Sequence, residues 1–381
     1  MQNLGSKRIF GLDVIRATAI ILVMSSHCAM LVLPDNQTNI YLSFFKFFGA
    51  IGVDLFFVLS GFLIGRIILR HIQKNETSFK DILYFWIRRW FRTLPNYFLL
   101  LILNIIIFYS LFGIFDFRMG EFILFIQNFA SPHPNFFPEA WSLSIEEYAY
   151  IFGPLVLLIL VHLFKIRNKS YLFLMMTSIV VVTVFILRYL YISKQGFVDY
   201  NDWSRNIRKV VVYRIDSIYF GFFAAYISIT LKYYWQKFKY VGLVLGLILF
   251  IGMHAIIWKY SIQPYNSEVF YGLWYLILLP LSLLLIFPYF SLWQEGGFFK
   301  NQIRRTSKIS YSLYLVNMSL VFIPLRHFVN LNQTAYLSKI IMFILYWALS
   351  FLIAGALYRF YEKPLMDLRN HRRVLRYFGK T

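Results

Sequence analysis

The chain has 381 residues, of which 59% are hydrophobic, 21% aromatic and only 14% charged. A soluble domain carries roughly 25% charged residues, so this composition excludes an ordinary soluble domain and indicates an integral membrane protein. The formal net charge of +21 is explained by loops that face the cytoplasm and anionic lipid. No basic, aromatic-interleaved soluble module is present, which argues against nucleic acid as a partner.

Apolar runs recur along the whole chain, each near the roughly 20 residues that a helix needs to cross the hydrocarbon core. Lipid offers backbone groups no hydrogen-bond partner, so these runs must be helices. The predicted fold class is therefore all-α, a polytopic membrane protein with one transmembrane domain over 1–381. The ten helices are expected at 9–33, 44–69, 94–115, 140–164, 171–192, 213–231, 240–258, 268–288, 309–329 and 338–358.

The distribution of basic residues predicts the orientation. Most of the 38 Lys and Arg residues fall on the side of the N-terminus, which places both termini in the cytoplasm. Residues 79–93, which end before Pro95, predict a separate amphipathic helix at the cytoplasmic interface. Residues 116–140 and 193–212 predict outer loops, and an apolar patch suggests that the first one re-enters the membrane.

The first predicted helix contains RATAIILVMSSH, with Arg16 and His27 inside an apolar run. They are eleven positions apart, so both lie on one helix face, roughly 16 Å apart along the axis. Asp13 lies on the same stripe and can pair with Arg16. Ionisable groups inside a membrane usually serve function, although a buried Asp–Arg pair and a hydrogen-bonded histidine would also explain the stripe.

The types of residue in this stripe suggest a chemistry. A neutral imidazole accepts a proton near pH 7, and a guanidinium holds phosphate. The pattern therefore predicts a phosphate-bearing donor that enters from the cytoplasm and reacts part-way across the membrane at His27. Arg89 and Arg92 share a helix face and could clamp phosphates, or they could be a topology signal only.

Other polar residues are weaker candidates. Asp54 is the one acid of the second helix and could orient a histidine or an arginine, or anchor the helix. Arg214 and Asp216 at the start of the sixth helix suggest a structural ion pair. The single cysteine, Cys28, excludes an intrachain disulfide and is best interpreted as a small buried thiol.

The fourth helix begins with an acidic motif that suggests an outer site. Trp141, Ser142 and Glu146 are predicted at the outer mouth of this helix. Glu146 could bind a sugar hydroxyl or act as a base, or it could be an acid at a helix N-terminus. The histidines show no metal-ligand spacing, and hydrolase, Walker and Rossmann motifs are absent from the sequence.

Together these motifs resemble the membrane-bound acyltransferase family 3, which includes O-acetyltransferases of surface polysaccharides. The similarity covers nearly the whole chain in order and spacing. It rests on Arg16-x10-His27, GVDLFFVLSGFLI (52–64), IRRWFRTLP (87–95), WSLSIEE (141–147), RIDSIYFG (214–221), SYSLYLVN (310–317) and YEKP (361–364).

The resemblance implies about ten helices, acyl-CoA as the donor substrate, no permanently bound cofactor and an acceptor hydroxyl on the outer side. It implies that His27 is catalytic, that Glu146 holds the family's glutamate position, and that Arg16, Arg89 and Arg92 have donor-binding or structural roles. Two positions depart from the family: Val316-Asn317 replaces a frequent Trp-His pair, and Tyr-Ala-Tyr follows Glu147. We expect a standalone domain without the fused esterase-like domain of some members.

The predicted function is an O-acyltransferase of the cytoplasmic (inner) membrane. It would move an acetyl group from acetyl-CoA to an envelope glycan such as lipopolysaccharide O-antigen or exopolysaccharide. An acyltransferase for a small secreted glycoside is the alternative within enzymes. A proton-coupled transporter with Asp13, Arg16, His27 and Asp54 as a relay, or an acyl-group exporter, is the alternative from another class.

Overall fold

The computed structural model describes residues 8–33, 40–74, 76–113, 117–164, 166, 168–328 and 336–378. Within these ranges the chain is helical and contains no strand. The all-α fold class predicted from the sequence is therefore confirmed for the part of the chain that the structure describes. These ranges leave out four of the basic residues that contribute to the predicted orientation, Lys7, Lys165, Arg167 and Lys380. They also leave out the end of the span predicted at 94–115.

Nine helical segments are long and apolar enough to cross a membrane, counted over the described ranges only. Five of them are single helices close to their predicted bounds or longer: α1 (Phe10–Val32), α2 (Ile40–Gln73), α4 (Ala140–Leu163), α5 (Ser170–Ile192) and α10 (Lys239–Lys259). The other four are α3 (Phe79–Phe112), η3 with α11 (Phe270–Trp274, Tyr275–Leu292), α12 with η4 and α13 (Lys300–Val316, Asn317–Phe322, Ile323–Phe328), and α14 with η5 and α15 (Tyr336–Leu357, Tyr358–Glu362, Lys363–Leu368).

A tenth span arises if a sharply bent pair is counted as one. Its first part is α6 with η2 (Tyr200–Trp203, Ser204–Arg208), and its second part is α7 with α8 (Val211–Arg214, Asp216–Thr230). The two parts meet at an angle of 96°. The predicted outer loop 193–212 is thus helical over much of its length. The sequence predicted a loop here because charges of both signs interrupt the apolar pattern of the segment. Three short elements complete the description: the 3₁₀ helix η1 (Phe117–Ile123), α9 (Lys232–Lys237) and α16 (Arg372–Tyr377).

Helix α3 corrects the prediction of a separate interfacial helix at 79–93. It begins with a capping box, in which the Ser78 hydroxyl accepts from the Asp81 amide and the Asp81 carboxylate accepts from the Ser78 amide. It ends at Gly113, which adopts φ 66° as a left-handed cap. Pro95 lies inside the helix rather than ending it. Such prolines are tolerated in membrane helices because neighbouring groups bond to the nearby carbonyls.

The chain divides into two compact units. The first comprises residues 1–18, 54–75 and 148–308, and the second comprises 19–53, 76–147 and 309–381. Helix α1 contributes to both.

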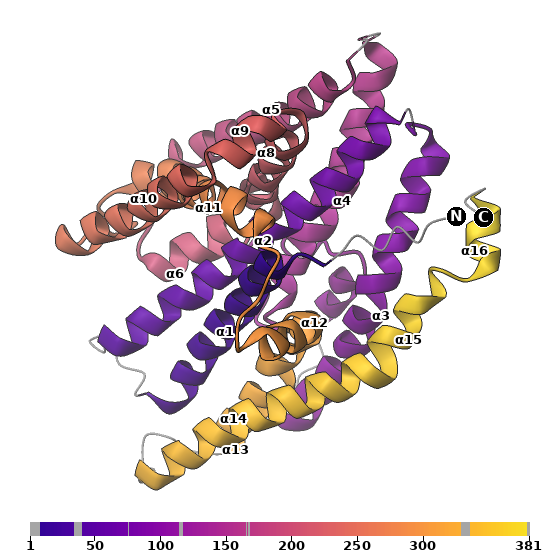
Figure 1. The fold of residues 1–381 in the computed structure, drawn as a ribbon. Coiled ribbons are helices and arrows are strands. Elements are labelled where there is room, and N and C mark those ends of the chain that lie inside the picture. The colour runs from indigo at the N-terminus through magenta and orange to yellow at the C-terminus, as the bar shows by residue number, and fades with distance from the viewer. Residues whose placement is uncertain are drawn as a thin grey trace. The chain divides into compact units, whose positions relative to one another are not determined.

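In the first unit α10 packs along α11 (Figure 1), where glycines allow close approach. A Cβ at Gly242 would lie 2.7 Å from the carbonyl oxygen of Leu285. Gly61 of α2 and Gly221 of α8 have the same role, because a Cβ on Gly61 would overlap the carbonyl oxygen of Ile218. Small residues at these positions therefore allow close helix packing.

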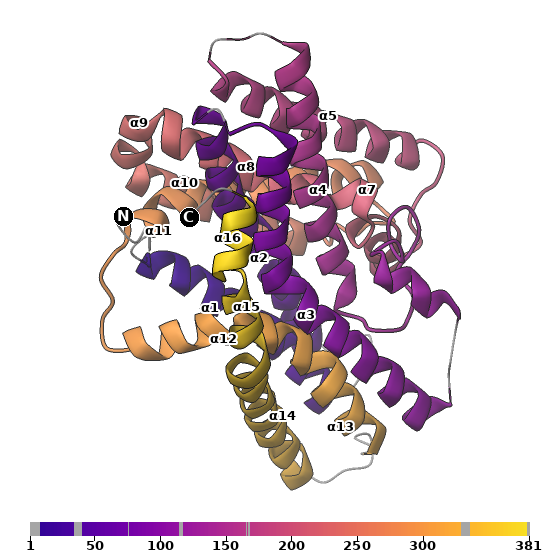
Figure 2. The same cartoon turned by 90° about the vertical axis from the view of Figure 1, so that its right-hand side faces the viewer.

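In the second unit the C-terminal helices return along α3. Figure 2 shows α15 and α16 beside it, and the rings of Tyr84 and Phe378 lie 5.1 Å apart. The segment before α4 also folds back, because Tyr97 in the middle of α3 donates to the carbonyl of Phe122 at 2.8 Å. Tyr97 precedes the end of α3 by about 22 Å of helix. The predicted outer loop 116–140 therefore packs deep along α3.

Candidate functional site

His27 lies in the C-terminal half of α1, within the second unit, and an amide faces its ring. Its Nδ1 lies 2.5 Å from Oδ1 of Asn317, the first residue of the π-helical turn η4. The Asn317 Nδ2 group donates to the carbonyls of Leu313 at 2.7 Å and Tyr314 at 2.8 Å. Carbonyl oxygens only accept hydrogen bonds, so the amide nitrogen must face them and Oδ1 must face the imidazole.

This orientation fixes the tautomer of His27. Since Asn317 Oδ1 is an acceptor, the His27 Nδ1 must carry the hydrogen, and the basic lone pair of the neutral ring lies on Nε2. The hydroxyl of Tyr346 on α14 also donates to Asn317 Oδ1, at 3.1 Å. Asn317 is fully buried. Asn317, which stands where the family often has the histidine of a Trp-His pair, is therefore the residue that orients His27.

Glu139, which sequence reasoning missed, lies beside the same turn. Its Oε1 accepts from the Ser319 hydroxyl at 2.6 Å and from the Ser319 amide at 3.3 Å. Its Oε2 is buried and has no hydrogen-bond partner among the described residues. Burial raises the pKa of this carboxyl from 4.5 to about 7, and the bonds from Ser319 lower it only in part. The only sequence signal was an acid in the otherwise apolar run before the tryptophan motif.

The motif that follows Glu139 packs against α12. The Ser142 hydroxyl lies 2.6 Å from the hydroxyl of Tyr314, and it also donates to the Glu139 carbonyl at 3.3 Å. The Trp141 carbonyl accepts from Asn128 at 3.0 Å. The contacts of Trp141 and Ser142 thus fix the entry into α4.

Glu146 forms an ion pair with the arginine segment. Arg89 on α3 donates to its Oε2 at 3.1 Å, and the two side chains are 12% and 17% exposed. Residues 79–93 belong to the same helix as the span, and the segment before α4 folds along that helix. Because Arg89 and Glu146 form an ion pair, Arg89 at the cytoplasmic interface and Glu146 at the outer mouth cannot both be correct.

The arginine segment meets three carboxyl groups in this unit. Beside the Arg89–Glu146 pair, Thr93 donates to Glu147 at 3.0 Å. Glu362 of the YEKP motif accepts from Asn96 at 2.9 Å and from Ser312 at 2.5 Å, and Arg92 lies within electrostatic range of it. Motifs that are far apart in the sequence thus converge, and two guanidinium groups face three carboxyl groups.

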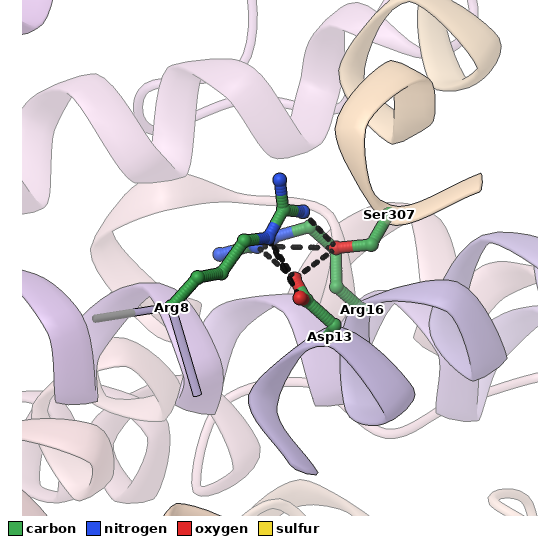
Figure 3. Close-up of polar contacts among 4 residues, drawn as sticks. All are labelled: Arg8, Asp13, Arg16 and Ser307. Atoms are coloured by element: carbon green, nitrogen blue, oxygen red, sulfur yellow. Dashed lines mark hydrogen bonds and ion pairs between the residues drawn. The ribbon is translucent and has the colours of Figure 1, made fainter. Parts of the chain in front are cut away.

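Arg16 belongs to a cluster in the first unit, shown in Figure 3. The expected pair with Asp13 is present at 3.7 Å. Asp13 is nearly fully buried and bonds more closely to Arg8, whose Nε lies 2.7 and 2.6 Å from its two oxygens. Ser307 on α12 donates to Asp13 Oδ1 at 2.7 Å. Arg8 and Ser307 were not predicted, because they lie outside the first span and almost 300 residues along the chain.

The ion pair predicted between Arg214 and Asp216 is replaced by two others. Arg214 pairs with Asp54 of α2, and Asp216 pairs with Arg188 of α5 at 2.5 Å. All four side chains are at most 2% exposed. Arg214 ends α7 and Asp216 begins α8, and the two side chains have different partners.

Cys28 follows His27 and is buried at 2% exposure, as expected for a packed thiol. Across the described residues no group of three or more His, Cys, Asp or Glu side chains is arranged to hold a metal ion.

Comparison with known proteins gives one family and several relatives. A family model described as an acyltransferase domain matches residues 9–359. A "Putative peptidoglycan O-acetyltransferase" of Bacillus subtilis is 33% identical over 178 residues, which cover 42% of this chain and 25% of that protein. A "Putative O-acetyltransferase" of Staphylococcus aureus is 26% identical over 351 residues, covering 83% of this chain and 52% of that protein.

A third relative is the peptidoglycan O-acetyltransferase OatA of Listeria monocytogenes. It is 33% identical over 130 residues, which cover 29% of this chain and 20% of OatA. The chain therefore spans about half or less of the length of these relatives. No solved structure shows significant similarity to the chain.

Proposed function

The chain belongs to the membrane-bound acyltransferase family 3, and from that premise we propose that it is a multi-pass O-acetyltransferase of the cytoplasmic membrane. It would transfer an acetyl group from acetyl-CoA to a hydroxyl of an envelope glycan. The observation that carries the proposal is the pair of His27 and Asn317, because it directs the basic nitrogen of an intramembrane histidine.

The proposed step needs one base and no covalent intermediate. His27 Nε2 takes the proton of the acceptor hydroxyl while the hydroxyl oxygen forms a bond to the thioester carbonyl carbon. When the carbon–sulfur bond breaks, the imidazolium returns the proton to the departing CoA thiolate. Asn317 keeps the ring in the productive tautomer throughout, as orienting partners of catalytic histidines do elsewhere.

The basic side chains would bind the donor. Arg16, Arg89 and Arg92 are the predicted partners of the CoA phosphates, because a guanidinium matches phosphate geometry. Arg89 already pairs with Glu146. Arg16 shares the Asp13 carboxylate with Arg8.

The acceptor is proposed from the relatives. Two of them carry peptidoglycan in their names, so among envelope glycans peptidoglycan and its lipid-linked precursors come first. Lipopolysaccharide O-antigen and exopolysaccharide, suggested by the family as a whole, come second. Glu139 and Ser142 lie at the start of α4, at the end of that helix where the predicted orientation places the acceptor.

The test is a transfer assay on purified protein in lipid nanodiscs. Radiolabelled acetyl-CoA is added with peptidoglycan precursor, lipopolysaccharide or exopolysaccharide extract, and label and free CoA are followed for wild type and His27→Ala. CoA release with label in one glycan, lost in a His27→Ala protein that elutes as a monodisperse peak, is the expected result.

The other outcomes separate the rival functions. Label that stays on the protein would replace direct transfer by an acyl-enzyme, with His27 as the acyl carrier. Label in a small soluble glycoside would change the acceptor class. Failure to bind or consume acetyl-CoA, together with proton-coupled flux into proteoliposomes, would overturn the acyltransferase in favour of a transporter.

A further inference from the structure

The backbone in front of α4 holds Glu139 in one direction. Phe137 has φ 45°, in the left-handed region that an aromatic residue rarely adopts, and Pro138 follows with its φ restricted by the ring. The Phe137 ring is fully buried and stacks on Tyr97, with the ring centroids 5.5 Å apart. Backbone conformations of this kind persist where the surroundings enforce them, and they cluster at active sites and ligand clamps. The packing of Phe137 therefore fixes the direction of the Cα–Cβ bond of Glu139.

The carboxyl group of Glu139 uses only one of its two oxygens. Its Oε1 accepts from the hydroxyl and the amide of Ser319. Its Oε2 is buried and receives no hydrogen bond from the part of the chain that the structure describes. A carboxylate has about four lone-pair sites, and a buried polar atom that lacks a partner costs free energy. A donor supplied by a ligand would remove this cost.

The groups that bond to Glu139 are neutral. Its backbone carbonyl accepts from the hydroxyls of Ser142 on α4 at 3.3 Å and Tyr314 on α12 at 3.4 Å, and its side chain accepts from Ser319 of η4. Tyr346 on α14 lies within electrostatic range. A carboxylate disfavours the anionic phosphates of CoA. Hydroxyl groups, which donate and accept, suit a ligand that carries several hydroxyls itself.

The π-helical turn η4 joins this carboxyl group to His27. Asn317 at the start of η4 faces the imidazole, and Ser319, two residues later, bonds to Glu139. The hydroxyl of Tyr346, which donates to Asn317, is the one within electrostatic range of Glu139. The imidazole and the carboxyl group therefore belong to one polar cluster of the second unit. Such π-helical turns occur frequently at functional sites.

We propose that Oε2 of Glu139 accepts a hydrogen bond from a second hydroxyl of the acceptor glycan, one that is not acetylated, while His27 takes the proton of the reacting hydroxyl. This inference rests on the proposed function and adds Glu139 as an acceptor-binding residue. An alcohol without the second hydroxyl leaves the buried oxygen unpaired. The site thus prefers sugars over water and simple alcohols.

The test is steady-state transfer from radiolabelled acetyl-CoA to the disaccharide of N-acetylglucosamine and N-acetylmuramic acid, with the full chain in nanodiscs. Glu139→Met keeps the length of the side chain and removes both oxygens. It should raise the KM for the disaccharide about tenfold to a hundredfold, as for a lost hydrogen bond to a charged group, and leave the KM for acetyl-CoA unchanged. Glu139→Gln, which keeps a polar amide, should fall between Glu139→Met and wild type.

The matched controls are Glu121→Met and Glu121→Gln. Glu121 lies in the same segment before α4 and already pairs with Arg118 at 3.1 Å, so both controls should keep the KM of wild type for the disaccharide. If label enters lipopolysaccharide or exopolysaccharide instead, the same comparison is made with that glycan.

Deoxy acceptors separate binding from folding. Disaccharides that each lack one hydroxyl are compared in wild type and Glu139→Met. The analogue that lacks the hydroxyl bound by Glu139 should raise KM in wild type as much as the substitution does. It should raise KM no further in Glu139→Met, because the interaction is already lost. A damaged fold would weaken every analogue in proportion, so additive losses for all of them would overturn the proposal.

Transfer by wild type distinguishes this inference from the proposed function. If wild type acetylates no glycan, the acyltransferase proposal fails. If wild type acetylates a glycan and Glu139→Met has the same KM for it, only the Glu139 site fails. If Glu139→Met does not elute as a monodisperse peak, Glu139→Gln, which keeps the volume and an oxygen for Ser319, replaces it in both comparisons with the same expected directions.

Discussion

Buried carboxyl groups in this protein usually face a guanidinium, and Glu139 does not. Asp54 pairs with Arg214, and Asp216 pairs with Arg188. Glu139 has only hydroxyl and amide donors, and no charged group lowers its pKa. A lone buried carboxyl favours its neutral form. The contribution of Glu139 to the free energy of unfolding therefore changes with pH near neutrality.

We predict that Glu139 makes the protein less stable as pH rises. The carboxyl has a pKa of about 7 in the folded state and an ordinary value of 4.5, so below pH 4.5 it is protonated in both states and costs nothing. Between pH 4.5 and 7 the unfolded state ionises first, which lowers the free energy of unfolding by about 3 kcal/mol across the window. Thermal unfolding in nanodiscs should show a steeper decline in wild type than in Glu139→Gln, because the other buried carboxyl groups remain in the variant. A parallel decline in both proteins would contradict the prediction, and Glu121→Gln at a partly exposed site is the control.

Asn317 gives a second prediction at this scale. Asn317→Ala removes the acceptor that sets the His27 tautomer, so kcat for acetyl transfer should fall about tenfold to a hundredfold. Asn104→Ala is the matched control, because Asn104 is equally buried in the same unit and also donates to the carbonyl four residues earlier. Equal losses in the two variants would show that Asn317 acts on stability alone, and circular dichroism should confirm that both fold.

At the level of helices, hydropathy located the spans but not their ends. Apolar runs predicted α1, α4 and α5 to within about two residues. Helix α12 begins at Lys300 instead of 309, and the last span continues from 358 through Leu368, because polar helical turns outside the hydrocarbon have no hydropathy signal. Pro95 led to the wrong prediction that a separate helix ends before it. A proline does not end a membrane helix whose neighbours supply donors.

The packing of α2 on α8 provides a test of element geometry. Gly61→Ala would force a methyl group onto the Ile218 carbonyl and should lower stability by about 1–3 kcal/mol or prevent folding. Gly252→Ala on α10 meets no atom within 4 Å and should be neutral or slightly stabilising. Thermal unfolding of both variants measures the difference, and unchanged stability of Gly61→Ala would contradict the close approach.

For the whole molecule, residue spacing could predict local pairs and could not predict distant ones. The Asp13–Arg16 pair follows from a three-residue separation on one helix. The partners that complete each cluster lie far away: Asn317 is 290 residues from His27, and Ser307 is 294 residues from Asp13. Glu139 was missed for the same reason, since its significance comes from Ser319.

The number of crossings decides where the termini lie. Nine spans put the termini on opposite sides of the membrane, whereas counting the bent pair as a tenth puts both in the cytoplasm, as the basic residues predict. In a Cys28→Ser background, an impermeant maleimide should label Gln195→Cys on intact cells and Tyr377→Cys only after permeabilisation. Labelling of Tyr377→Cys from outside would show that the bent pair does not cross.

The amide that faces His27 has a thermodynamic consequence. A carboxylate in that position would attract the imidazolium and make the ring slow to release the proton it had taken. An amide carries no net charge, so it selects which nitrogen bears the hydrogen and adds no such attraction. The ring is then oriented in the resting state at no cost to the second half of the cycle, in which the proton must pass to the leaving thiolate.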